Sequence, residues 1–361
     1  MEIAVLGGGN GSHAAALDLT EAGHRVRFWR RDRDAVGALR ARKNRLTLAD
    51  SQGEREIEIA LVTNDLSEAL RGSELIVCPA PATAQGEIAR SLAGHLVDGQ
   101  IVYLPPGTFG SYLMAKVVRD EGSCADVSFA EAGTLPYLTR KHGPERIAIT
   151  TRATRLPTGV FPHRNKAHAL AVIREAYPSV EDAGDALSGA LMNAGPIIHS
   201  PLIVMNAGPI EHFDHWDIHN EGTQPAIRRT TDRLDAERIA VREALGYGAP
   251  HFPLKDHYGG GEEWMYGNVA HDKLVSSGDW RERLVLTEHR YMREDVAMGL
   301  AFLVSVADWV GVPAPTATGL LAIGSAICSD DFRRTGRTLE NLDLSKLDRA
   351  AMRRLLEEGI E

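Results

Sequence analysis

The chain has 361 residues, of which 43% are hydrophobic and 25% charged, and its formal net charge is −9 at pH 7. This length suits two domains rather than one core, and the composition is that of a globular protein. The negative charge, without clustered runs of Lys or Arg, argues against a nucleic-acid-binding protein.

Three widely spaced cysteines, Cys78, Cys124 and Cys328, form no C-x-x-C pair. They argue against a disulfide framework or structural zinc and favour a reducing compartment. A strand pattern begins at residue 2 and leaves no room for a signal peptide, so we expect a cytoplasmic protein. Residues 186–210 contain no Asp, Glu, Lys or Arg, but their prolines, glycines, asparagines and histidine favour a buried helix over a membrane span.

The first thirty residues have the pattern of a strand, a glycine-rich turn, a helix ending at Gly23, and a second strand at 25–29. The turn follows the dinucleotide-binding pattern G-x-G-x-x-G, with serine at the third glycine. The first glycine permits the tight turn, the second admits a pyrophosphate, and the N–H groups of the helix start bind it. The alternative is a plain glycine turn of an α/β protein. The predicted cofactor-binding residues here are Gly7, Gly9, Asn10, Gly11 and Ser12.

The end of the second strand bears on which dinucleotide binds. An acidic residue there would accept a hydrogen bond from the ribose 2′-hydroxyl of NAD. This chain has Arg30 and Arg31, followed by Asp32. Two guanidinium groups suit the 2′-phosphate of NADP, although Asp32 could turn inward or the arginines could be solvated. We therefore favour NADP, with NAD possible.

Strands and helices continue to alternate, with strands predicted at 75–80, 100–104 and 127–131 and helices at 83–96 and up to 119. This alternation is typical of a doubly wound sheet, whose ligands bind beyond the C-terminal ends of the strands. Pro79 and Pro105 stand at two such ends, where they either line the nicotinamide side or only terminate strands.

Helical periodicity dominates the second half, at 186–206, 228–245, 291–310 and 315–329. We predict an α/β Rossmann-type dinucleotide-binding domain at 1–183 and an all-α domain at 184–361.

A hydride-transfer enzyme needs a proton donor, and histidine suits this task near neutral pH. The pattern M-N-A-G-P-I-x-H occurs twice, ending at His199 and at His212. His212, His215 and His219 match no strong metal-binding pattern, so we predict no metal site. A lone histidine such as His199 is more often a core residue than a catalyst, so spacing does not decide between the two copies.

Several motifs resemble the opine dehydrogenase family, which includes octopine, nopaline and carboxyethyl-norvaline dehydrogenases. The segment GGGNGSHA at 7–14 is close to that family's G-x-G-N-G-[GA]-H-A, and a central Asn193 precedes a helix that contains His199 and Pro201. Further matching segments follow in order along nearly the whole chain, at 206, 221–223, 235–240, 258–259, 290–296, 311–315 and 331–340.

The resemblance implies that His199 is the catalytic acid/base, that Asp295 is its partner, and that a homodimer forms. It implies reductive condensation of an amino acid with a 2-oxo acid through an imine. Asn193, Tyr258 and Arg290 are candidates for binding substrate carboxylates, although Arg290 could equally form a surface salt bridge. One departure from the family is Ser200, inserted where the family has His-Pro, which puts substrate preference in doubt.

Two alternatives remain open. Ketopantoate reductase and glycerol-3-phosphate dehydrogenase, which have a related fold, reduce a ketone with a lysine at the start of the helical domain, but residues 167–254 contain no lysine. A histidine-dependent reductase of ketones or cyclic imines remains possible. The other alternative is a non-catalytic NADP sensor, against which the presence of both His199 and Asp295 argues.

Overall fold

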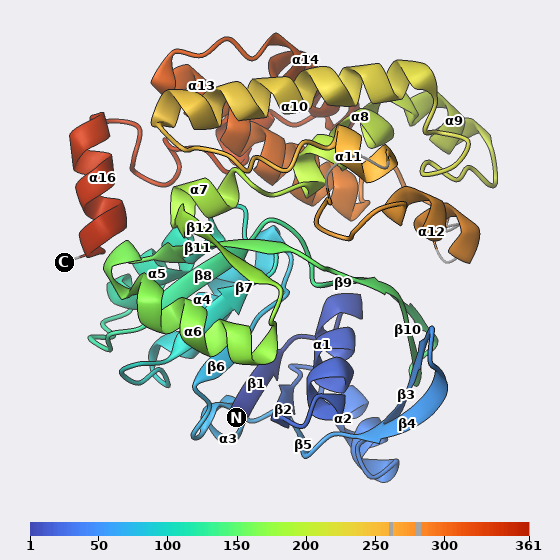
Figure 1. Ribbon diagram of the computed structural model, residues 1–361, viewed down its shortest axis with the longest axis vertical. Helices are drawn as coiled ribbons and strands as arrows, with labels where there is room; N and C mark the ends of the chain where they lie inside the picture. The colour runs from blue at the N-terminus through green and yellow to red at the C-terminus, as the bar shows by residue number, and fades with distance from the viewer. Residues whose placement is uncertain (260–262, 279, 281–282, 361) are drawn as a thin grey trace. The chain divides into compact units, whose positions relative to one another are not determined.

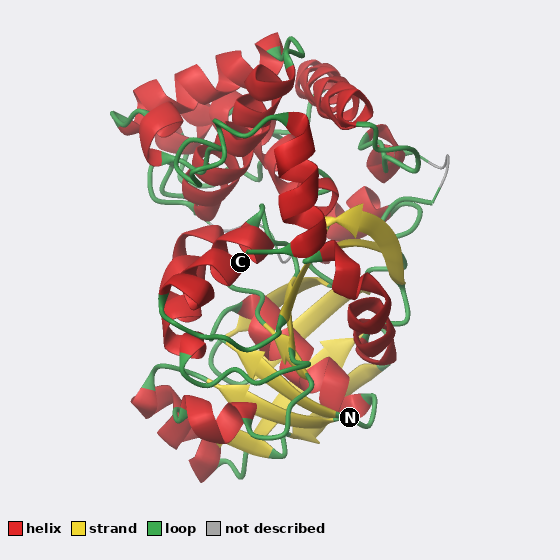
Figure 2. Cartoon of the chain, turned by 90° about the vertical axis from the view of Figure 1, so that its left-hand side faces the viewer, coloured by secondary structure: helices red, strands yellow, loops and turns green. Residues whose placement is uncertain are grey.

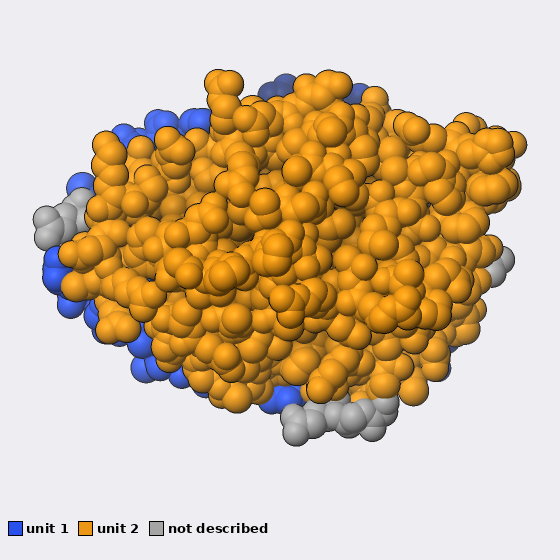
Figure 3. Space-filling model, turned by 90° about the horizontal axis from the view of Figure 1, so that it is seen from above, with its two compact units in different colours: residues 1–80, 84–190, 354–361 blue, residues 81–83, 191–353 orange. Residues whose placement is uncertain are grey.

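The computed structural model describes residues 1–259, 263–278, 280 and 283–360 (Figure 1). Its contacts divide the chain into unit 1, residues 1–80, 84–190 and 354 onward, and unit 2, residues 81–83 and 191–353 (Figure 3). The boundary that we predicted between 183 and 184 lies shortly before the change of unit at Ala190 and Leu191. The short segments 81–83 and 354 onward each pack with the unit that the sequence order did not suggest.

Unit 1 is built on an eight-stranded sheet in the order β12-β11-β8-β7-β6-β1-β2-β5. Neighbouring strands are parallel except β8 and β11, which pair antiparallel. The chain winds outward in both directions from β1, which confirms the predicted doubly wound fold. The strands are β1 (Glu2–Leu6), β2 (Arg25–Trp29), β5 (Leu61–Thr63), β6 (Leu75–Val77), β7 (Ile101–Leu104), β8 (Ser128–Ala132), β11 (Leu156–Phe161) and β12 (Val180–Asp185).

Helices cover both faces of this sheet, so its central strands are apolar on both sides. Along β1, Ile3 and Val5 join one buried cluster while Ala4 and Leu6 join another. The helices of unit 1 are α1 (Asn10–Glu21), α2 (Arg33–Ala41), α3 (Leu66–Leu70), α4 (Gln85–Ala93), α5 (Gly110–Asp120), α6 (Lys166–Ala176) and α7 (Ala186–Ala190), with a 3-10 turn η2 (His163–Asn165).

Strand β6 is shorter than predicted, because it ends at Val77 rather than at residue 80. The Cys78 N–H still donates to the carbonyl of Tyr103, at 2.8 Å. Pro79 has no N–H to continue the ladder, so the chain leaves the sheet there. The departure turns residues 78–80 into a loop at the C-terminal end of the strand.

A second sheet, which the sequence analysis did not predict, has the order β4-β3-β10-β9. Its strands are β3 (Arg45–Asp50), β4 (Gly53–Glu58), β9 (Tyr137–His142) and β10 (Arg146–Arg152). Strands β9, β10, β3 and β4 contact α1, beside which they run in Figure 1. Four of the six residues of β4 are charged, Glu54, Arg55, Glu56 and Glu58, so the strand has almost no apolar signal. This sheet brings residues near 140 to the helix that follows the glycine turn.

Helices are the regular secondary structure of unit 2 among its described residues, and the strands in Figure 2 all belong to unit 1. The long helix predicted at 186–206 is wrong, because α7 and α8 are separated by a turn at 191–194. In that turn Asn193 Oδ1 accepts the Gly195 N–H at 3.0 Å, an arrangement that competes with a continuous helix. The helices are α8 (Gly195–Met205), α9 (Ala207–His212), α10 (Pro225–Leu245), α11 (Lys255–Tyr258), α12 (Ala270–Ser277), the π-helix η3 (Tyr291–Leu300), α13 (Ala301–Val310), α14 (Pro315–Cys328) and α15 (Phe332–Thr335).

Residues 186–205 are apolar and long enough by composition to cross a membrane, and 89% of an 18-residue stretch within them is buried in the protein. Such burial is typical of a core helix in a globular domain. Four charged residues of α10, Asp235, Glu237, Arg238 and Arg242, are buried as well, and each has polar partners. Glu237 accepts the N–H groups of Thr316 and Ala317 at the start of α14, and Arg238 pairs with Asp235 at 2.7 Å.

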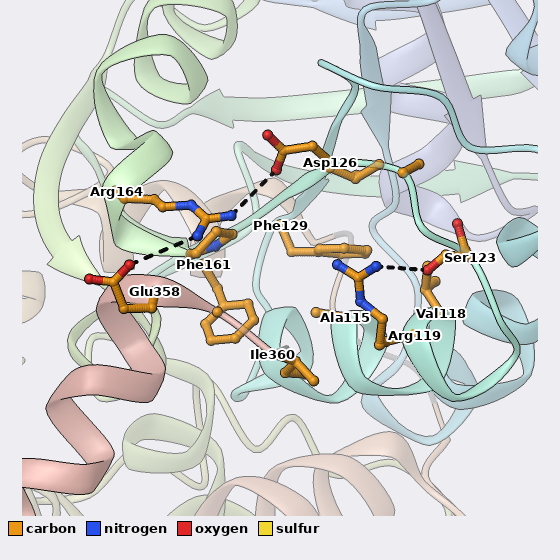
Figure 4. A pocket seen from close by; sticks show the side chains of 14 residues that line it. Ala115, Val118, Arg119, Ser123, Asp126, Phe129, Phe161, Arg164, Glu358 and Ile360 are labelled. Atoms are coloured by element: carbon orange, nitrogen blue, oxygen red, sulfur yellow. Dashed lines mark hydrogen bonds and ion pairs between the residues drawn. The ribbon is translucent and has the colours of Figure 1, made fainter.

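A small cavity of about 40 Å³ lies in unit 1, where the end of helix α16 (Arg349–Glu358) packs (Figure 4). Arg164 lies 3.9 Å from both Asp126 and Glu358 there, and the Arg119 guanidinium donates to the carbonyl of Ser123 at 3.0 Å. A space of this size holds about one or two water molecules, not a dinucleotide. The cavity therefore belongs to the docking of the C-terminal residues.

Candidate active site

The glycine turn between β1 and α1 is shaped by two local contacts. Gly7 has φ +115°, and a Cβ there would lie 2.6 Å from Ser12 Oγ, so only glycine fits without strain. Ser12 is buried and donates its hydroxyl to the carbonyl of Leu6 at 3.0 Å. The serine at the third glycine position thus permits the close contact of helix and strand, and adds a hydrogen bond to it.

Helix α1 begins with N–H groups that no side-chain hydrogen bond caps within the described chain. A Cβ on Gly9, the residue before the helix, would meet no atom within 4 Å, so open space adjoins this end. Gly11, two residues further along the chain, is enclosed, because a Cβ there would lie 2.8 Å from Leu135 and 3.3 Å from Pro79. A pyrophosphate fits the open side, where the N–H groups and the helix dipole attract an anion.

His13 is a residue of the turn to which the sequence analysis assigned no role. Its Nδ1 lies 2.8 Å from the carbonyl of Gly9, and its ring packs edge-on against Phe28 at 5.0 Å. Burial lowers the pKa of His13 to about 3, against the opposing effect of the Gly9 carbonyl. The ring is therefore neutral and donates Nδ1–H, which holds the turn in shape.

The two arginines predicted to bind a 2′-phosphate lie in different surroundings. Arg31 is exposed and forms an ion pair with Glu87 at 2.5 Å. Arg30 lies over the turn, since a Cβ on Gly8 would be 3.2 Å from its Nη2, and its Nε is buried without a hydrogen-bond partner among the described residues. Asp32 does not turn inward, because its Oδ1 accepts the N–H groups of Asp34 and Ala35 at the start of α2. Only Arg30 of the three faces the glycine turn.

The prolines at the strand ends have different neighbours. Pro79 touches the glycine turn at Gly11, whereas Pro105 is buried at the end of β7. The loop after Pro105 is arranged around the buried carboxylate of Glu131, which accepts the N–H of Phe109 at 2.7 Å. A buried glutamate could not be predicted from the residue pattern, because glutamate is rarely buried.

In unit 2, the candidate pair from the sequence analysis is in contact. His199 Nδ1 lies 2.9 Å from Asp295 Oδ2, with 15% and 9% of the two side chains exposed. His199 is on α8 and Asp295 on the π-helix η3, 96 residues later in the chain. Pi-helical turns are frequent at functional sites. A hydrogen bond at this distance fixes the orientation of the imidazole and its tautomer.

Tyr291 provides the face against which the imidazole lies. Its ring stacks on that of His199 with centroids 3.7 Å apart and an interplanar angle of 11°. The Tyr291 hydroxyl lies 3.0 Å from His219 Nε2, and His219 is itself edge-on to His199 at 6.0 Å. His219, which we considered as part of a metal cluster, instead supports the stack. No group of three metal-ligand side chains occurs in the described part of the chain.

Two glycines allow α8 and η3 to approach closely enough for the pair to form. A Cβ on Gly195 would lie 2.4 Å from Asp295 Oδ1, and a Cβ on Gly299 would lie 2.0 Å from Pro196. Because real Cβ contacts are never so short, both positions require glycine or a movement of the helices. Pro201, two residues after His199, cannot donate to the carbonyl of Ile197.

Charged neighbours surround the Asp295 carboxylate. Burial raises the pKa of Asp295 to about 7, while the positive charges of Arg290 and His289 act in the opposite direction. The adjacent Glu294 also has a raised pKa, from burial and from Asp295, and it accepts the N–H of Ala82 at 3.0 Å. Arg337 donates to the carbonyl of the same Ala82 at 2.8 Å. The neighbouring glutamate therefore anchors residues 81–83, a contact with no local signal in the sequence.

The three predicted substrate residues differ in availability. Arg290 keeps an exposed side chain, although its guanidinium carbon lies 5.0 Å from the centre of the Tyr291 ring. Tyr258 lies under the guanidinium of Arg228 at 4.6 Å. The side chain of Asn193 shapes the turn before α8. His212, the histidine of the second copy of the repeated pattern, is at the end of α9 beside Phe213.

Comparison with known proteins agrees with this architecture. Residues 182–328 match the family model of the NAD/NADP octopine/nopaline dehydrogenase α-helical domain, and residues 2–123 match that of the NAD-dependent glycerol-3-phosphate dehydrogenase N-terminus. An opine dehydrogenase of Arthrobacter sp. (strain 1C) is 28% identical over an alignment of 361 positions, which covers 98% of each chain. The chain is an opine dehydrogenase-like, NAD(P)-dependent oxidoreductase.

Solved structures show the same fold for this opine dehydrogenase-like chain. An octopine dehydrogenase with NADH and L-arginine aligns at a TM-score of 0.73 with 17% identity, covering 100% of this chain and 99% of that one. A yersinopine dehydrogenase with NADP⁺ bound aligns at 0.65 with 15% identity, covering 99% and 98%. At these identities the likenesses show that the chain has the same fold as the two enzymes.

Proposed function

We propose that this enzyme joins an amino acid to a 2-oxo acid by reductive condensation. The amine attacks the keto carbon, water leaves, and the resulting imine is reduced to a secondary amine dicarboxylate. The bound nicotinamide dinucleotide supplies the hydride when it is in its reduced form. The observation that carries the proposal is the His199–Asp295 pair, 2.9 Å apart, in a helical domain of the octopine/nopaline dehydrogenase type.

His199 is proposed as the acid/base. Its Nδ1 is held by Asp295, so protons would be exchanged with the substrate at the other ring nitrogen, Nε2. The carbonyl oxygen must be protonated before it leaves as water, and the imine nitrogen is more reactive toward hydride when protonated. The stacked Tyr291 ring holds the plane of the imidazole, and therefore the direction in which Nε2 points.

Arg290 is proposed to bind a substrate carboxylate. Arg290 is an exposed residue directly before η3, five positions from Asp295. A planar guanidinium binds a carboxylate in a bidentate manner. Tyr258 and Asn193 remain weaker candidates, because the structure gives each of them a local structural partner.

We also propose that the enzyme prefers NADP(H) to NAD(H). Arg30 is the residue proposed to bind the adenosine end, because its guanidinium lies over the glycine turn. Asp32, the natural partner of a ribose 2′-hydroxyl, is occupied at the start of α2.

The decisive experiment measures consumption of NADPH with a panel of 2-oxo acids, each with and without a panel of amino acids. The proposal requires both substrates together, and mass spectrometry of the product should show the secondary amine. Consumption with a 2-oxo acid or cyclic imine alone would identify a simple reductase instead. No consumption with any pair, from protein that binds NADPH, would contradict the proposal.

A further inference from the structure

We propose that Lys141, on strand β9 of the small sheet, is a second selectivity residue that binds the 2′-phosphate of NADP(H) together with Arg30. The inference rests on the proposed preference for NADP(H). It assigns a role in cofactor choice to the four-stranded sheet, which is separate from the eight-stranded sheet that carries the glycine turn.

Backbone contacts hold Lys141 beside the turn. The Lys141 N–H donates to Asn10 Oδ1 at 3.2 Å, which fixes strand β9 to the first residue of α1. Arg30 approaches the same turn from the end of β2, with its Nη2 and Nε 3.2 and 3.3 Å from the position of a Cβ on Gly8. The backbone of Lys141 and the guanidinium of Arg30, from distant parts of the sequence, thus lie beside the same turn.

No carboxylate forms an ion pair with either cation among the described residues, whereas neighbouring arginines have partners. Arg31 pairs with Glu87, and Arg42 pairs with Glu145 at 2.8 Å. Asp32 is the carboxylate nearest in sequence to Arg30, but its Oδ1 binds two N–H groups of α2. Both cations are half-buried. Their positive charges are therefore neither fully hydrated nor neutralised by the protein.

The electrostatics agree with this arrangement. Burial lowers the pKa of Lys141, and the positive charge of Arg30 lowers it further. Burial also lowers the pKa of Arg30, although Asp32 acts in the opposite direction. The positive charges of Lys141 and Arg30 also lower the pKa of His13, which lies in the first turn of α1. A dianionic phosphate between the two cations would remove their repulsion and accept charge-assisted hydrogen bonds from each.

A phosphate at this position could belong to the pyrophosphate or to the 2′ position of the adenosine ribose. The place of Arg30 favours the 2′ position, because the residues after β2 are those that meet the adenosine ribose in this type of fold. The pyrophosphate has its own site in the uncapped N–H groups of α1. We therefore assign the two cations to the 2′-phosphate.

The test compares Lys141→Met with the wild type by calorimetric titration of four ligands: NADPH, NADH, adenosine 2′,5′-bisphosphate and 5′-ADP. Loss of one charge-assisted contact should weaken binding of NADPH and the 2′,5′-bisphosphate about tenfold or more. NADH and 5′-ADP, which lack the 2′-phosphate, should bind within about twofold of the wild type. Lys141→Arg should restore most of the NADPH affinity.

Lys116→Met is the matched control, because Lys116 pairs with Asp120 on α5 and should leave all four affinities unchanged. Equal loss for NADH and NADPH would overturn the inference and assign Lys141 to the pyrophosphate or to folding. Unchanged NADPH affinity would overturn it as well. Wild-type protein that binds NADH as tightly as NADPH would contradict the proposed cofactor preference itself, a result visible before any variant is made.

Discussion

Gly195 and Asp295 are packed so closely that one added methyl group at Gly195 would lie 2.4 Å from the Oδ1 of Asp295. The position has no positive φ, so the constraint is contact with the carboxylate rather than backbone strain. Gly195 also donates its N–H to Asn193 Oδ1 at 3.0 Å. A small residue at the start of α8 therefore sets the place of the carboxylate that orients His199.

We predict that Gly195→Ala displaces Asp295 and lowers turnover by about 10²-fold, since general acid/base catalysis typically contributes 10²–10⁴-fold. Binding of NADPH should be unchanged. Gly208→Ala on α9 is the control, because a Cβ there meets nothing within 4 Å. Steady-state kinetics of both variants would show the difference, and equal activity of the two would contradict the assigned packing role.

Removal of either member of the His199–Asp295 pair should reduce turnover without loss of cofactor affinity. His199→Ala removes the proposed acid/base, and Asp295→Asn keeps the shape but not the charge that selects the ring tautomer. We expect kcat to fall about 10²–10⁴-fold in each case. Asp308→Asn, which changes an exposed partner of Arg333, should behave as wild type. Full activity of His199→Ala would exclude this histidine as the acid/base.

Local signals in the sequence were sufficient for the first strands and helix of the cofactor domain. A strand, a glycine turn and a helix within thirty residues predicted β1, α1 and β2 with small errors at their ends. Residues that depend on distant contacts gave no such signal. Lys141 stands 131 positions after Asn10, its backbone partner, and lies on a sheet that the apolar pattern did not show.

In the helical domain, too, local patterns predicted some features and contacts between distant residues decided others. The resemblance to the opine dehydrogenases pointed to His199 and Asp295, but neither residue pattern nor spacing could show Tyr291 stacked on the imidazole. An uncharged stretch looked like one helix, because composition does not show that Asn193 closes a turn within it. Arg30 and Arg31 were equivalent as neighbours in sequence, and only their partners distinguish them.

Tyr291 permits a separation of stacking from hydrogen bonding. Tyr291→Phe keeps the ring against His199 and removes the hydroxyl that lies 3.0 Å from His219 Nε2. We expect it to retain kcat within about tenfold, since one neutral hydrogen bond is worth roughly 1 kcal/mol. Tyr291→Leu removes the ring as well and should lower kcat further than Tyr291→Phe does. Equal kinetics of the two variants would show that the aromatic face has no part in catalysis.

Stability should fall in acid because of two buried histidines, and His257 offers the clearer test. Burial lowers the pKa of both His257 and His13 from 6.5 to about 3. The unfolded chain therefore binds more protons between these values, so the stability that neutral rings provide is present above pH 6.5 and lost as the pH falls toward 3. The effect for one such ring is on the order of 3 kcal/mol or less at pH 4.

His257→Phe should therefore flatten the dependence of the melting temperature on pH between 6.5 and 4. The phenyl ring has a similar size and fits among Tyr258 and Trp264, which surround the imidazole. Its nitrogens have no hydrogen-bond partner among the described residues, so the substitution breaks no such bond. His95→Phe at an exposed position should keep the wild-type slope. If His257→Phe loses stability in acid as steeply as the wild type, the buried imidazole is not the group responsible.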